Sequence, residues 1–272
     1  MGTSTRWPGP RGGVWVAPNT RLGWVDTLTA GGISAVPSDS AADPAQEPRN
    51  AAAEQQLVRA VEQVADALFQ TIRVEPDAFD LRLALSAAGA NLVNVLEDLS
   101  TTGATVTEDL PEGTAAARET AYIQWLVCRV CGAGGTATDS VIRRSAVYCG
   151  RYMLDNDRFR RAIDGEDAGY RLSGELLCEV YQLFFAQAFE EFLKSLVTAK
   201  IVLWLPILQV IDPAGVIADW VADNIVKHIP NPCEEAAGRG GHDASLPELA
   251  RGLLEETVRR VLGLPVGTTG GS

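Results

Sequence analysis

Apolar residues recur at steps of three and four along most of the chain after residue 50. In the first such stretch, Leu57, Val61, Val64, Leu68 and Ile72 fall on one side of a helical wheel. This spacing matches the 3.6 residues per turn of an α-helix, whereas a half-buried strand alternates every second residue. The pattern therefore predicts amphipathic helices that bury one face in a shared core.

Polar residues placed just before the apolar runs predict where helices begin. We expect Asn50, Asp77 and Ser173 to accept hydrogen bonds from the first free backbone N–H groups of the helices that follow them. Ser245 and Glu248 have the spacing of a capping box, in which each side chain bonds the backbone of the other residue. Helix ends are predicted where glycine or proline follows an apolar run, at Pro76, Gly103, Gly132, Pro230 and Gly263.

These signals divide residues 51–262 into about seven helices. The predicted ranges are 51–74, 78–100, 114–131, 138–159, 174–198, 213–229 and 246–262. The helix after Ser173 has the widest apolar face, which is typical of the centre of a bundle. Because no alternating runs predict strands in this part of the chain, the sequence predicts an all-α bundle of about seven helices with an irregular N-terminal arm.

Composition divides the chain into three parts. Residues 1–50 are rich in Pro, Gly, Ser and Thr and are predicted to form an irregular arm and linker. Residues 51–236 are predicted to form the helical bundle core, and residues 237–272 a linker, a C-terminal helix and a flexible tail. Trp15 and Trp24 lie in the arm, where we expect them to pack on the chain's own core or on another protein.

The charge of the chain excludes some partners. It has 35 acidic and 23 basic side chains, a net charge of −12. Nonspecific binding to nucleic acid or to an anionic membrane needs a basic surface, so we expect no nucleic-acid partner. Three of the basic residues are lysines and the rest are arginines, a bias that indicates a high-GC genome and hence a high-GC bacterium.

Cysteine usage predicts the compartment. The count of five is odd, and the cysteines lie in apolar settings. Residues 1–10 contain no apolar run of the kind that a signal peptide needs. We therefore expect reduced thiols and a cytoplasmic location.

The sequence contains few candidates for chemistry. Cys128 and Cys131 have a spacing that zinc sites use, but no second pair follows, and cysteine in an apolar helix usually packs as a small hydrophobe. The chain has two histidines, His228 and His242, and neither has a recognisable nucleophile partner. Gly132–Thr136 lacks the Gly-Lys-Ser/Thr of a phosphate loop. We therefore predict no catalytic, cofactor-binding or metal-binding residue and no cofactor.

The segment 196–226 is the most apolar part of the chain. Its longest uninterrupted apolar run, Ile201–Leu208, is far shorter than the ~20 residues of a membrane-spanning helix. Asp212 and Asp219 follow, and an aspartate at the bilayer centre costs about 2.5–3.5 kcal/mol. We expect buried core helices here, with a reversibly membrane-inserting hairpin as the alternative.

One group of arginines stands out in this acidic chain. Steps of three, four and seven residues place several of them on one helical face. We expect them to pair with acidic helices of the same chain or, as the alternative, to recognise an acidic partner segment or an anion. The group consists of Arg143, Arg144, Arg151, Arg158, Arg160 and Arg161.

Three functional hypotheses follow, and a role without catalysis is favoured over an enzyme. The first is a noncatalytic interaction, adaptor or regulatory module that binds a protein partner. The second is a membrane-acting effector that uses an apolar helical hairpin around 196–226. The third is a helical-bundle enzyme with a carboxylate-bound metal, although adjacent acids such as Glu97-Asp98 and Glu190-Glu191 point about 100° apart on a helix. The oligomeric state is left open.

Overall fold

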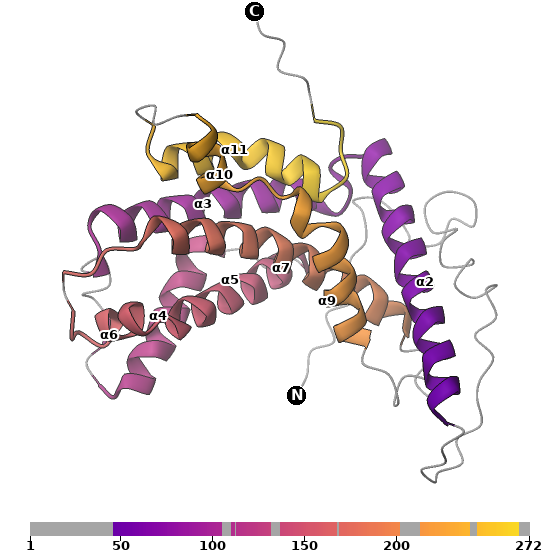
Figure 1. Ribbon diagram of the computed structural model, residues 1–272, viewed down its shortest axis with the longest axis horizontal. Helices are drawn as coiled ribbons and strands as arrows, with labels where there is room; N and C mark the ends of the chain where they lie inside the picture. The colour runs from indigo at the N-terminus through magenta and orange to yellow at the C-terminus, as the bar shows by residue number, and fades with distance from the viewer. Residues whose placement is uncertain are drawn as a thin grey trace, which may run out of the picture.

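The computed structural model describes residues 46–104, 110–111, 113–131, 137–167, 169–201, 213–239 and 244–266 (Figure 1). The arm and linker were predicted at 1–50; residues 1–45 lie outside the described residues, and residues 46–50 are helical, against the prediction. The glycine segment 132–136, His242 and most of the run Ile201–Leu208 also lie outside the described residues. The all-α prediction is confirmed, because every element of secondary structure in the described ranges is helical. The elements are α2 (Gln46–Val74), η1 (Ala78–Asp80), α3 (Leu81–Thr101), α4 (Ala115–Cys131), α5 (Ala137–Asp155), α6 (Asp157–Ile163), α7 (Gly174–Ile201), α9 (Pro213–Asn224), η4 (Val226–His228), α10 (Pro232–Gly238) and α11 (Leu246–Val261).

Helix α7 lies at the centre of the bundle, as its wide apolar face predicts. It packs against α3, α5, α9 and α11 (Figure 1). Its aromatic side chains Tyr181, Phe184, Phe185, Phe189 and Phe192 are buried. Burial of each ring stabilises the fold by about 1.5–3 kcal/mol, so this helix organises the core.

Helix α2 reaches the core through the second half of its length. The residues of its predicted apolar stripe are all buried, and Phe69 stacks on Phe189 of α7 with ring centroids 5.6 Å apart. Gly263, just after α11, lies against the Phe69 ring. Its φ of +63° is a left-handed conformation, and a Cβ there would lie 2.8 Å from Phe69. Both facts require glycine at this position.

Two helix boundaries differ from the prediction near the start of the bundle. Helix α2 begins at Gln46, so Asn50 lies inside it rather than at its N-cap. Pro48 does not prevent this, because proline is tolerated in the first turn of a helix. The Asp77 side chain makes no cap hydrogen bond; its carboxylate instead accepts one from Arg82 Nε at 2.8 Å.

Two further short helices were not predicted. The range 138–159 is broken at Asn156, whose Oδ1 accepts hydrogen bonds from the backbone N–H groups of Arg158 and Phe159 and so caps α6. Asn231 similarly caps α10 by accepting from the Cys233 N–H at 2.9 Å. By contrast, the predicted caps are confirmed at Ser173, which accepts from Leu176 N–H, and at the Ser245–Glu248 capping box.

The cysteines correct one prediction. Cys178 of α7 and Cys233 of α10 form a disulfide, with their Cα atoms 5.9 Å apart. The expectation of reduced thiols is therefore wrong for this pair. It is confirmed for Cys128, Cys131 and Cys149, which are free.

Among the described residues, no helix combines the length and the apolar character that crossing a membrane requires.

Candidate functional site

The polar side chains that most resemble a binding site lie where α5 packs against α7. The two helices run antiparallel, because Arg144 contacts Glu191 near one end of the pair and Tyr152 contacts Glu179 near the other. We call this surface the α5–α7 seam and define it by Arg144, Tyr148, Arg151, Tyr152, Glu179 and Glu191.

One end of the seam carries a compact cluster of charges. The side chains of Glu190 and Glu191 are 14% and 15% exposed, so both carboxylates are largely withdrawn from water. Lys194 Nζ forms ion pairs with both carboxylates. Arg144 Nε lies 2.9 Å from Glu191 Oε2, and an Arg144 terminal nitrogen donates to Ser195 Oγ at 3.0 Å. Two acids thus face two bases, which compensates the cost of their burial.

The protonation state of this ion cluster follows from its geometry. Burial by itself lowers the pKa of Lys194, but the hydrogen bond and charge of Glu190, together with the charge of Glu191, raise it above its ordinary value. Lys194 is therefore a cation at neutral pH. A charged lysine has no lone pair to act as a base or a nucleophile, so Lys194 balances the charge of the two glutamates while Arg144 links the cluster to α5.

The other end of the seam is a single neutral-to-charged hydrogen bond. The Tyr152 hydroxyl donates to Glu179 Oε2 at 3.0 Å. Burial, this hydrogen bond and the charge of Glu179 raise the pKa of Tyr152, so the phenol keeps its proton and remains the donor.

Between these ends the surface is open. Tyr148 is 48% exposed, although its ring is large and apolar. Arg144 and Arg151 lie four residues before it and three residues after it, so all three face outward along α5. The antiparallel register places Tyr148 opposite the turn of α7 that contains the half-buried Leu183. The seam therefore presents an aromatic ring between two guanidinium groups.

The predicted arginine group is divided by the helix break at Asn156. Arg160 pairs with Asp157, and the Arg158 guanidinium lies over the Tyr170 ring at 5.6 Å. Arg151 is exposed and makes no ion pair with any other described residue. Intramolecular pairing thus accounts for part of the group and leaves Arg151 available.

The CxxC pair is not the buried pair that its apolar setting predicts. Cys128 is exposed, and Cys131 is half-buried. Burial raises the pKa of Cys131 to about 11, with Arg143 opposing the shift. Its thiol is protonated at neutral pH, and a protonated thiol is a poor nucleophile and metal ligand. In the described ranges, no three His, Cys, Asp or Glu side chains are grouped so that they could hold a metal ion.

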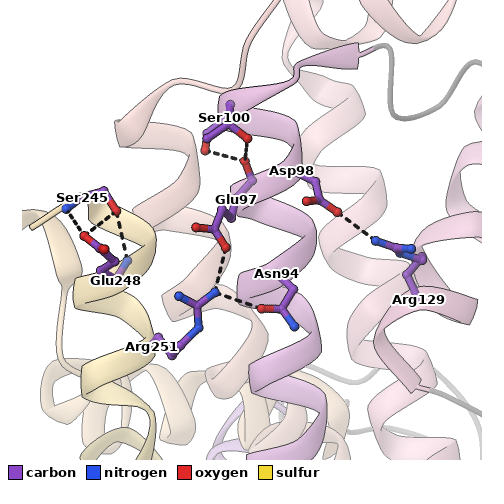
Figure 2. A network of polar contacts seen from close by, with 9 residues as sticks. Asn94, Glu97, Asp98, Ser100, Arg129, Ser245, Glu248 and Arg251 are labelled. Carbon is purple, nitrogen blue, oxygen red and sulfur yellow. Dashed lines mark hydrogen bonds and ion pairs between the residues drawn. The ribbon is translucent and has the colours of Figure 1, made fainter.

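A second polar network ties α3 to its neighbours (Figure 2). Arg251 of α11 donates to Asn94 at 3.0 Å and to Glu97 at 2.8 Å, while Arg129 of α4 pairs with Asp98 at 2.8 Å. The adjacent acids Glu97 and Asp98 thus serve opposite neighbours, as their predicted angular separation requires. These exposed pairs each contribute about 0–1 kcal/mol, so the network orients helices rather than forming a reaction centre.

The described elements define the chain as an all-α protein built around one central helix, with an arginine- and tyrosine-bearing seam. No family model, curated protein or solved structure matches it.

Proposed function

We propose that this chain is a noncatalytic interaction module that binds a protein partner along the α5–α7 seam in the cytoplasm of a high-GC bacterium. The observation that carries the proposal is the exposure of Tyr148 between Arg144 and Arg151. A single exposed apolar side chain is ordinary on a protein surface. Tyrosine and arginine together, however, are the residues most enriched where binding energy concentrates in protein interfaces.

The chemistry of the seam selects an acidic partner segment. Arg151 has no ion-pair partner among the described residues, and Arg144 is fixed by Glu191, which holds its guanidinium in place. Guanidinium groups bind carboxylates through paired hydrogen bonds. We infer that the partner presents an amphipathic helix to the seam. An apolar side chain of that helix packs against Tyr148 and Leu183, and its acidic side chains face Arg144 and Arg151.

Affinity purification from the native host tests the proposal. The full chain is the bait, and Tyr148→Ser and Arg151→Glu are compared with wild type. Arg59→Glu is the matched control, because Arg59 is exposed on α2, outside the seam. We expect one stoichiometric partner that wild type and the control retain and that each seam variant binds roughly tenfold more weakly.

Binding between the purified bait and that partner then tests whether Arg151 binds acidic side chains of the partner through its charge. Raising the salt concentration is expected to weaken binding by wild type more than binding by Arg151→Glu. The absence of any stoichiometric partner, or a partner retained equally by the seam variants, contradicts the proposal.

A further inference from the structure

The disulfide joins a deeply packed helix to a lightly packed one. Cys178 is 3% exposed, and its neighbours Leu177 and Val180 on α7 are fully buried. Cys233, at the other end of the bond, is half-buried on α10. Cys233 is therefore the more accessible of the two cysteines, and we expect an attacking thiolate to approach the bond from its side.

The segment 226–239 contributes few side chains to the core. Its buried side chains are Ile229 and Pro232, and the Gln182 amide of α7 donates to the Ile229 carbonyl at 3.1 Å. Helix α10 also lies beside α11 (Figure 1). A helix of seven residues is too short to persist without tertiary contacts, and segments with little buried surface open at low free-energy cost.

We propose that the Cys178–Cys233 disulfide is a redox-controlled tether, which closes α10 onto α7 when oxidised and lets the segment 226–239 open when reduced. The proposal rests on the cytoplasmic location proposed above, because disulfides in the cytosol are usually transient and serve either catalysis or redox sensing. It does not depend on the α5–α7 seam.

The reaction needs a dithiol reductant and transfers two electrons. One thiolate of the reductant attacks Cys233 Sγ, and the Cys178 sulfur leaves as a thiolate that takes up a proton. The second thiolate of the reductant attacks the mixed disulfide, which releases Cys233 as a thiolate and leaves the reductant as a disulfide. Cys233, once protonated, keeps only a weak S–H contact to the Gly174 carbonyl, 3.4 Å away, in place of the covalent bond.

Hydrogen exchange on the full chain tests this tether, with dithiothreitol as the reductant. After reduction we expect the amides of 226–239 to exchange at least roughly tenfold faster, while those of α3 and of the first half of α7 stay protected. Unchanged exchange in 226–239 overturns the proposal. Simultaneous loss of protection in α7 also overturns it, because the disulfide would then be a staple of the whole fold.

Two variants separate the tether from the other thiols. Cys233→Ser is expected to show, with and without reductant, the fast exchange in 226–239 that wild type shows only after reduction. Cys128→Ser, which changes an exposed free cysteine, is expected to respond to reductant as wild type does. If Cys233→Ser does not fold, the reduced wild-type chain still decides the question.

Thiol trapping in the native host tests whether the Cys178–Cys233 pair changes its oxidation state in the cell. We expect a pair that is reduced during growth and oxidised after peroxide treatment. A pair that stays fully oxidised or fully reduced under both conditions rules out switching. A fully oxidised pair also contradicts the cytoplasmic location, whereas the partner capture described above would be unaffected.

Discussion

The two halves of α7 are held to their neighbours by different chemistry. In the first half, Cys178 is bonded covalently to α10, and the Tyr181 hydroxyl lies 2.7 Å from Thr257 Oγ1 of α11 in a buried hydrogen bond. In the second half, Glu191 forms an ion pair with Arg144 of α5, while Lys194, on α7 itself, forms ion pairs with Glu190 and Glu191. The first half is thus anchored to α10 and α11 by covalent and neutral contacts, and the second half to α5 by an ion pair.

This difference follows from how far the side chains that make these contacts are exposed to water. Tyr181 and Thr257 are fully buried, where an unpaired charge is costly and a neutral hydrogen bond is strong. Lys194 retains 27% exposure, so its ammonium group reaches water while it neutralises two carboxylates. The polar contacts of the second half of α7 therefore depend on charge balance, whereas those of the first half depend on matched neutral partners.

The largest effect is expected from the core that both halves share. Phe189→Ala removes the ring that stacks on Phe69 and leaves a cavity at the junction of α2 and α7. We expect a loss of about 3–5 kcal/mol in the free energy of unfolding, measured by urea denaturation. Tyr148→Ala, at an exposed position, serves as the control. Similar losses of unfolding free energy for the two variants would contradict the placement of Phe189 in the core.

A smaller loss is expected from breaking the charge balance of the second half. Lys194→Met leaves Glu190 without its cation and is expected to cost about 2–3 kcal/mol at pH 7, less than for a fully buried pair because Lys194 is partly exposed. Lys194→Arg is expected to restore most of the loss.

The pH dependence of this effect has a defined sign. Because the pKa of Lys194 is raised in the folded chain, its contribution is complete below the unfolded-state pKa of ~10.4 and is lost as the pH rises through the folded pKa. The gap in unfolding free energy between wild type and Lys194→Met should therefore narrow in alkali. A gap that is constant or widens there would show that Lys194 acts through packing.

The smallest of the three effects is expected in the first half. Tyr181→Phe leaves the buried Thr257 hydroxyl without its partner and is expected to cost about 1–2 kcal/mol. Adding Thr257→Val should recover part of that loss, because both polar groups are then gone. Thermal unfolding of the four forms in a double-mutant cycle measures this coupling, and additive losses would contradict it.

Helix positions were predictable where the signal acts within one turn. Ser173 and the Ser245–Glu248 box cap their helices as expected, because a cap bonds backbone groups two or three residues away. The cap at Asn156 was missed inside a continuous apolar pattern, although Asn followed by Asp is an available start signal. The same holds for Asn231, where Pro232 at the first helical position is a further start signal.

The features of the candidate site were less predictable. The helical spacing of the arginines was visible in the sequence, but the exposure of Tyr148 between two of them depends on how α5 settles against α7. Similarly, the packing of α4 on α3 and α5 leaves Cys128 exposed, against the expectation of a core cysteine. A wide apolar stripe does not specify which of its border residues the neighbouring helix covers.

The helical class, most helix ends and the central place of α7 could be predicted from the sequence, because periodicity and capping depend on near neighbours in the chain. Tertiary packing sets which cysteines meet, which arginine of α5 reaches Glu191 and which tyrosine stays exposed. Cys178 and Cys233 are 55 residues apart, and their encounter depends on the packing of the intervening segments. Such contacts are set by the three-dimensional arrangement of surfaces, which no local pattern encodes.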